Sequence, residues 1–380
     1  MLSKRFPQTI VFSVFLVATA AIADEPAANP AVDARAYQTA VDRAVEYLKT
    51  KGQAPDGTYS KFAGSGVTSV VTTALLRQGL SPDDPLVARS LKYLEGLVQP
   101  DGGIFAPKSD YQNYETSLAL MCFAEANKDH RYDKIIKAAD GYLKATQWGE
   151  GRGIDKSDPR WGGGGYGKHK RPDLSNTSFL IDALKAAGNS PDDEAMKRAL
   201  VFVSRCQNLE SEANTTPFAA KAGEDDRGGF YYTPAEGGES FAGKTPEGGL
   251  RSYGSMTYAG LKSMIYAGVK ADDPRVKAAV KWTQMHYGLA TNPGMGPSGL
   301  YYYYHTFAKA LAATGLTLVE DAKGVKHDWR QELLAELLRR QRANGSWTNE
   351  DTRWLEADPN LVTGYALLSM AYCRPAAGGK

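Results

Sequence analysis

Apolar residues recur at helical spacing in the stretch 171–193, which reads RPDLSNTSFLIDALKAAGNSPDD. The residues that form this apolar face are Phe179, Leu180, Ala183, Leu184 and Ala187. Because spacings of three and four residues place side chains on one side of a helix, the pattern predicts an amphipathic helix here. Ser175 or Asn176 is expected to cap its start, and Gly188 followed by Pro191 is expected to end it.

The stretch 68–84, TSVVTTALLRQGLSPDD, repeats this pattern near the start of the chain. Aligning Gly79 with Gly188 brings Thr68 over Thr177. Self-similarity of this kind is typical of proteins built from stacked copies of one supersecondary unit.

Six such units are predicted, each with a first helix, a Gly-containing turn that usually begins with Gln, and a second helix. The first helices are expected at 33–49, 85–98, 132–146, 192–206, 273–286 and 328–340. The second helices are expected from residue 68, at 115–126, from residue 176, and at 256–267, 301–313 and 362–372. Their equivalent positions are Thr68, Thr116, Thr177, Thr257, Tyr304 and Thr363.

Helix pairs of this kind can stack as a linear solenoid or close into a ring. We expect the ring, an all-α fold of the α/α toroid type with six inner and six outer helices. All the long insertions precede a second helix, so the long loops are expected on one face, where binding sites commonly lie.

The first 23 residues have the pattern of a signal peptide. Lys4 and Arg5 precede an apolar run, and Ala21-Ile22-Ala23 supplies the small residues of a cleavage site. We expect a short leader at 24–32 and one toroid domain over 33–380. The chain is thus predicted to be exported, either to a periplasm or into the medium, and no later segment is apolar enough to predict a membrane span.

Charge and cysteine content narrow the classes of partner. The chain has 45 basic and 43 acidic residues, and removing Lys4 and Arg5 leaves 43 of each. A net charge of zero argues against nucleic acid as the main partner.

The cysteines Cys122, Cys206 and Cys373 are far apart in the sequence. Buried thiols are expected, with a single disulfide as the alternative.

The turns share a heptapeptide with Gln first, Gly fifth and an aromatic residue seventh. It occurs at 53–59 (QAPDGTY) and 341–347 (QRANGSW), and 99–105 (QPDGGIF) is a variant with Gly at the fourth and fifth positions. This pattern resembles the QW repeat of squalene and oxidosqualene cyclases and the repeats of protein prenyltransferase β subunits. The resemblance covers essentially the whole mature chain and implies an α/α toroid with an apolar central cavity.

Squalene-type cyclases protonate their substrate with the second Asp of an Asp-x-Asp-Asp-Thr-Ala motif. The best match here is 173–178 (DLSNTS), in which Asp173 and Thr177 are retained and Ser175 replaces the acid. A serine cannot protonate an alkene. Glu115 is a lone carboxylate at a comparable place in another second helix.

Prenyltransferase β subunits bind zinc with an Asp-x-Cys pair and the His of a Tyr-His-Thr sequence. Residues 304–306 (YHT) match the second part, but Ser255 and Thr257 replace Asp and Cys. One His is too few for a zinc site, so we expect no metal and no cofactor. His305 is then either a proton donor at the cavity wall or a hydrogen-bonded core residue.

Two long loops carry further candidates. The loop 148–175 has seven cations including Arg171 beside a Gly-rich run, which suits either an anion site or a solvated loop. The loop 208–254 carries Asp226 and Arg227 among acidic residues, which could bind calcium or serve as an acid/base pair, again with a solvated surface as the alternative. Ligand contacts are expected from Tyr114, Asn176, Arg171, Asp226, Arg227, Tyr253 and Tyr304.

These observations predict an exported toroid that binds an apolar, isoprenoid-like molecule or a partner segment in its cavity. One alternative is an atypical terpenoid cyclase or lyase that uses Glu115, Asp173 or His305 as its catalytic groups, with Asp226 or Tyr253 as further candidates. Toroids also host carbohydrate-degrading enzymes, for which two facing carboxylates would be required. The third alternative is a protein-interaction scaffold with an exposed apolar rim.

Overall fold

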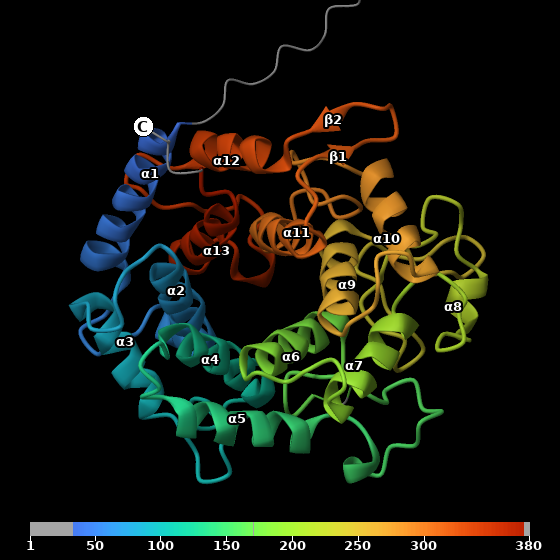
Figure 1. Ribbon diagram of the computed structural model, residues 1–380, viewed down its shortest axis with the longest axis horizontal. Coiled ribbons are helices and arrows are strands. Elements are labelled where there is room, and N and C mark those ends of the chain that lie inside the picture. The colour runs from blue at the N-terminus through green and yellow to red at the C-terminus, as the bar shows by residue number, and fades with distance from the viewer. Residues whose placement is uncertain (1–32, 170, 376–380) are drawn as a thin grey trace, which may run out of the picture. The chain divides into compact units, whose positions relative to one another are not determined.

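A computed structural model describes residues 33–169 and 171–375, all within one compact unit, Ala31–Lys380 (Figure 1). The expected signal peptide at 1–23 and leader at 24–32 lie outside the described residues. The outer helices are α1 (Ala34–Tyr47), α3 (Pro85–Glu95), α5 (Asp133–Thr146), α7 (Glu194–Arg205), α10 (Pro274–Met285) and α12 (Trp329–Arg340). The inner helices are α2 (Gly66–Arg77), α4 (Gln112–Ala126), α6 (Leu174–Ala186), α9 (Gly254–Tyr266), α11 (Leu300–Thr314) and α13 (Pro359–Tyr372).

The inner helices form a closed ring. Each contacts the next in the order α2, α4, α6, α9, α11, α13, and α13 packs against α2 (Figure 1). The predicted α/α toroid is therefore confirmed, and the linear solenoid is excluded. The remaining elements are short. They are the four-residue helix α8 (Pro217–Ala220), the antiparallel pair β1 (Val319–Glu320) with β2 (Lys326–His327), and the π or 3-10 segments η1 (Leu48–Gly52), η2 (Lys61–Ala63), η3 (Glu150–Arg152) and η4 (Arg353–Leu355).

One hydrogen bond recurs in five of the six helix pairs. A threonine hydroxyl near the start of the inner helix accepts from a backbone N–H in the preceding turn, at 2.9–3.2 Å. The threonines are Thr68, Thr116, Thr177, Thr257 and Thr363, which the sequence alignment had placed at one repeat position. Tyr304, the sixth aligned residue, differs, because its hydroxyl donates to the carbonyl of Leu289.

Turn glutamines join four of the helix pairs to the pair that follows. Four of them donate from Nε2 to a backbone carbonyl of the following outer helix, as Gln53 does to Leu86 at 2.7 Å. The other three such bonds are Gln147 to Ala195, Gln207 to Arg275 and Gln341 to Ala40. Each turn is thereby fastened to a neighbouring helix as well as to its own.

Helix α6 starts earlier than the sequence indicated. Its N-cap is Asp173, which accepts from the backbone N–H of Asn176 at 2.9 Å. The prediction of a Ser175 or Asn176 cap was wrong, because both residues already lie inside the helix. The predicted end is close, since the helix stops at Ala186 and Gly188 has a φ of 90°.

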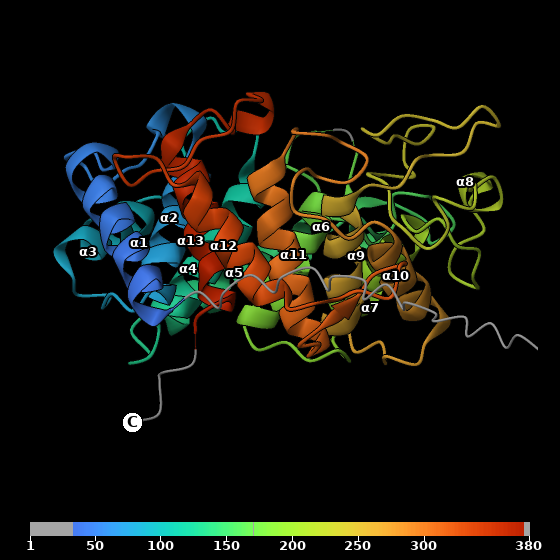
Figure 2. The ribbon, with the colours of Figure 1, turned by 90° about the horizontal axis from the view of Figure 1, so that it is seen from above.

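The loops before α9 and α13 project from the same side of the ring (Figure 2). Within the described residues the three cysteines are free and buried. No helix in this part of the chain is long and apolar enough to cross a membrane.

Candidate functional site

A cavity of about 740 Å³ opens among the N-terminal halves of the inner helices. Every inner helix contributes to its wall, from Val67 on α2 to Tyr365 on α13. Its aromatic lining consists of Phe62, Tyr111, Tyr114, Tyr166, Phe179, Tyr232, Phe241, Tyr253, Tyr302, Trp354 and Tyr365. The fold thus has a central cavity, as the resemblance implied, and aromatic side chains supply much of its wall.

Several tyrosine hydroxyls of this wall are bonded to one another or to neighbouring residues. Tyr302 Oη lies 2.8 Å from Ser175 Oγ, which joins α11 to α6. Tyr365 and Tyr114 share a hydrogen bond, and burial raises the pKa of Tyr114 to about 12. Burial also raises the pKa of Tyr253 and Tyr365 well above the ordinary value. Burial therefore favours the neutral phenol at these three positions.

The buried carboxylates of the cavity hold its loops in place. Glu115 accepts from the backbone N–H groups of Ser65 at 3.3 Å and Ala106 at 2.8 Å. Glu356 accepts from the Tyr302 N–H at 2.8 Å and the Asn349 side chain at 2.7 Å. Each carboxylate thus accepts from its own set of donors.

The motif at 173–178 lies against the same cavity. Ser175, at the position of the cyclase acid, is one of its lining residues. The Asp173 carboxylate accepts from the Asn176 N–H and, at 2.7 Å, from the Asn176 side chain. Burial raises the pKa of Asp173 to about 6, against the opposing effect of these bonds and of one with Tyr232.

The other residues predicted from the sequence divide into two groups. Tyr114 and Tyr253 line the cavity. Arg171 pairs with Glu239 at its edge and lies over the Tyr232 ring. The remaining three are elsewhere: Asp226 accepts from the Ser252 N–H in its loop, Arg227 is exposed, and Tyr304 is bonded toward the outer ring.

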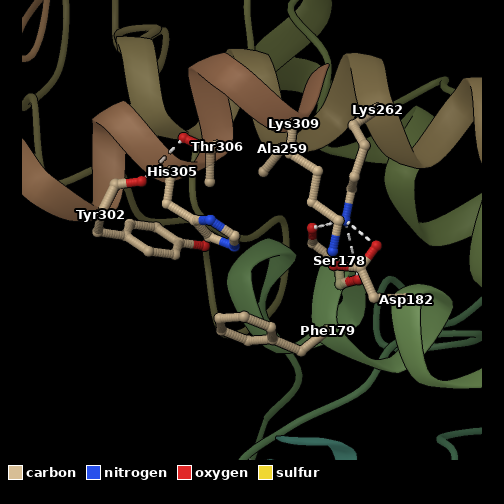
Figure 3. Close-up of a pocket in the computed structure, with 9 residues that line it drawn as sticks. All are labelled: Ser178, Phe179, Asp182, Ala259, Lys262, Tyr302, His305, Thr306 and Lys309. Atoms are coloured by element: carbon tan, nitrogen blue, oxygen red, sulfur yellow. Dashed lines mark hydrogen bonds and ion pairs between the residues drawn. The ribbon is translucent and has the colours of Figure 1, made fainter. Parts of the chain in front are cut away.

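Below the cavity, three charged residues from three inner helices meet (Figure 3). Asp182 on α6 accepts from Lys262 on α9 and from Lys309 on α11, both at 2.6 Å. Burial alone would raise the pKa of Asp182, but the two ammonium groups outweigh it and hold this pKa below its ordinary value. Burial lowers the pKa of Lys262 to about 8, although Asp182 opposes the shift.

His305 lies beside this cluster, next to Tyr302 (Figure 3). Its imidazole stacks on Tyr365 with ring centroids 5.7 Å apart. Burial and the nearby cations lower its pKa well below the ordinary value, so the ring is neutral. Among the described residues, no group of three or more His, Cys, Asp or Glu side chains is arranged so that it could hold a metal ion.

Sequence reasoning missed the cluster, although a signal was present. Asp182, Lys262 and Lys309 each interrupt an otherwise apolar stretch of an inner helix: FLIDAL, AGLKSM and TFAKAL. A charge in the middle of such a stretch predicts a buried partner. Which helices supply that partner depends on the closure of the ring.

Comparisons with known proteins agree on the fold. The family profile "Squalene-hopene cyclase C-terminal domain" matches residues 60–223. The type II terpene cyclase MstE from Scytonema superposes with a TM-score of 0.52 at 14% identity, covering 90% of this chain and 98% of its own. No curated protein sequence matches the chain significantly.

Carbohydrate-active enzymes have the same fold. A polysaccharide lyase gives a TM-score of 0.51 at 9% identity, covering 88% of this chain and 96% of its own. A family 76 glycoside hydrolase from a bovine Bacteroides thetaiotaomicron strain gives 0.51 at 12%, covering 88% and 77%. The chain therefore has a squalene cyclase-like fold, which it shares with glycosidases and lyases, and its function must be argued from its own site.

Proposed function

We propose that this chain is an exported protein that binds an apolar, isoprenoid-sized molecule in its central cavity. The observation that carries the proposal is the aromatic wall, to which eleven aromatic side chains contribute around about 740 Å³. This volume lies in the range of sites that enclose a small-molecule ligand. Burial of apolar surface against such a wall supplies the main favourable free energy of binding.

The buried carboxylates favour this function over sugar hydrolysis. Glycoside hydrolysis requires two carboxyl groups that flank one bond of the substrate. Glu115 instead accepts from backbone N–H groups of two loops, and Glu356 accepts from the start of α11 and from the Asn349 side chain. Breaking those bonds to act on a sugar would release the loops that shape the cavity.

Ligand binding can be tested with the one tryptophan that lines the cavity, Trp354. The mature protein should be titrated with geranylgeraniol while tryptophan fluorescence and calorimetric heat are recorded. We expect saturable binding with both methods, and a Trp354→Phe variant that loses the fluorescence change but retains calorimetric binding.

A variant that fills the cavity provides the second arm of this test. Ser175→Trp should abolish binding, because it puts a large ring into the cavity wall. Tyr304→Phe, on a residue bonded toward the outer ring, should bind like the wild type. Wild-type protein that binds no neutral isoprenoid, and from which organic solvent extracts no apolar molecule, would contradict the proposal.

Export is a separate part of the proposal and rests on the pattern of residues 1–23. Expression of the full chain in an exporting bacterial host should give a product whose intact mass begins at Asp24. Recovery of the full-length chain from the cytoplasm alone would contradict export and leave the binding proposal untouched.

A catalytic role is the second candidate, and Asp173 favours it. This buried carboxyl has its pKa raised to about 6 and bonds Tyr232, a residue of the cavity wall. Acid–base catalysts are commonly tuned in this way. Incubation with geranylgeraniol followed by gas chromatography would show a rearranged product in the wild type and none in Asp173→Asn, whereas unchanged substrate in both would rule out this reaction.

A further inference from the structure

A smaller cavity borders the large one at its floor. Phe179 and Tyr302 line both, with ring centroids 6.1 Å apart. The small cavity has a volume of about 10 Å³, room for a single water-sized group. Figure 3 shows His305 on one side of it and the Lys–Asp cluster on the other.

The two lysines of the cluster differ in how fully they are bonded. Lys262 Nζ donates to Asp182 Oδ1, to Ser178 Oγ and to the Ser178 carbonyl, which uses its three N–H groups. Lys309 Nζ donates only to Asp182 Oδ2 among the described residues, at 2.6 Å. Lys309 lines the small cavity, so two of its N–H groups are available to an acceptor there.

The imidazole of His305 also has a polar atom without a hydrogen bond in the part of the chain that the structure describes. Its side chain is 6% exposed, and Nδ1 has no hydrogen-bond partner among the described residues. Leaving a buried polar atom unbonded is unfavourable, as is leaving two donors of a buried ammonium unbonded. Both groups line a cavity in which a polar atom of a ligand would bind them.

The cluster also carries an excess positive charge. Two ammonium groups share the single carboxylate of Asp182, and all three side chains are at most 9% exposed. Farther along the ring, Arg77 is balanced by Glu125 at 2.9 Å. Loss of a proton from Lys262 would remove the excess, but with a pKa of about 8 this group is still mostly charged at pH 7. The cluster therefore carries one positive charge that Asp182 does not balance.

We propose that the floor of the cavity binds the carboxylate end of an apolar acid, with one carboxylate oxygen accepting from Lys309 and the apolar body lying in the aromatic cavity. This inference rests on the proposed function and narrows it to a ligand class, the monocarboxylic acids with an isoprenoid-like tail. A charge-assisted hydrogen bond in a buried site gives such an acid an advantage that a neutral alcohol of the same length lacks.

The test compares farnesoic acid with farnesol, two ligands that differ only at the end group, by calorimetry in chloride-free buffer at pH 7. For the wild type we expect the acid to bind roughly 10- to 100-fold more tightly, the usual contribution of a bond to a charged group. Lys309→Met should bring the acid down to the affinity of the alcohol and leave the alcohol unchanged. Lys185→Met, at an exposed position of α6, should alter neither.

The outcomes separate this inference from the proposed function. Binding of farnesol with no preference for the acid would overturn the inference and leave the proposed function standing, whereas binding of neither ligand would overturn both. A third outcome is that the wild type binds acid and alcohol equally well, and sodium chloride alone raises the melting temperature of the wild type but not of Lys309→Met. The site then binds a halide, and the inference is again overturned. If Lys309→Met does not fold, Lys309→Gln takes its place. The ratio of the wild-type affinities for acid and alcohol tests the inference even without a variant.

Discussion

Gln341 Nε2 donates a hydrogen bond to the carbonyl of Ala40 at 2.8 Å, although the two residues are 301 positions apart in the chain. The bond joins the turn after α12 to α1, the first helix of the fold. It is the counterpart of the bond that Gln53 makes to Leu86 in the next helix pair. The contact that links consecutive pairs is thus also used where the last pair meets the first.

Loss of this closing contact should destabilise the fold. We expect Gln341→Ala to lower the free energy of unfolding by about 1–3 kcal/mol, because the Ala40 and Gly345 carbonyls both lose their donor. Urea denaturation measures the change. Gln99→Ala is the matched control, since Gln99 Nε2 donates to Leu97 of its own turn and should have a smaller effect. Equal losses in the two variants would show that the contact has no special role in ring closure.

The turn glycines are required where they approach a neighbouring helix. Gly345 has a φ of 89°, and a Cβ built there would lie 2.2 Å from the Arg43 carbonyl oxygen. Gly188 has nearly the same φ, 90°, but nothing within 4 Å of that Cβ position. Ala at residue 188 should therefore cost only about 1–2 kcal/mol of backbone strain. Gly345→Ala should cost clearly more in the same denaturation assay, and equal costs would show that the backbone can shift freely at residue 345.

The repeat positions could be predicted from the sequence because they depend on local spacing. Thr68 and Thr177 align when Gly79 is set over Gly188, and both make the same bond to the preceding turn. The predicted start of α6 was wrong because several nearby residues are suitable N-caps. Three polar residues, Asp173, Ser175 and Asn176, lie close together, and only the backbone conformation selects Asp173.

Side-chain direction within the ring was harder to predict. Four consecutive tyrosines begin at residue 301, and helical spacing alone does not say which of them faces the cavity. The structure directs Tyr302 into the cavity and bonds Tyr304 to Leu289. The Asp182 cluster was missed for a related reason, since its members come from three inner helices whose relative rotation is fixed only when the ring closes.

Asp182 is the counter-charge for two buried lysines, so its removal should be strongly destabilising. We expect Asp182→Asn to lower the free energy of unfolding by about 3–5 kcal/mol, the usual effect of leaving buried charges unpaired. Adding Lys309→Met should recover part of this loss, because one of the two uncompensated cations is then absent. Denaturant unfolding of both single variants and the double variant gives the coupling energy, and strict additivity would mean that the three groups do not interact.

Asp173 should give stability an unusual dependence on pH. Its folded-state pKa is about 6 against 3.8 for the free residue, so between these values the folded protein holds a proton that the unfolded chain has released. The wild type should therefore lose stability relative to Asp173→Asn as the pH rises from about 4 to about 6, by about 3 kcal/mol in total, and no further above that. Urea denaturation of both proteins at intervals from pH 4 to 7.5 measures the difference.

Asp273 is the matched control, because it is also an N-cap but its bond with Arg275 holds its pKa below the ordinary value. The stability that this carboxylate contributes is present above pH 4 and lost only at lower pH, so wild type minus Asp273→Asn should stay level over the same range. If the stability difference between the wild type and Asp173→Asn also stays constant with pH, the Asp173 carboxyl is better solvated than the structure indicates. That result would also contradict a role for Asp173 as a catalytic acid.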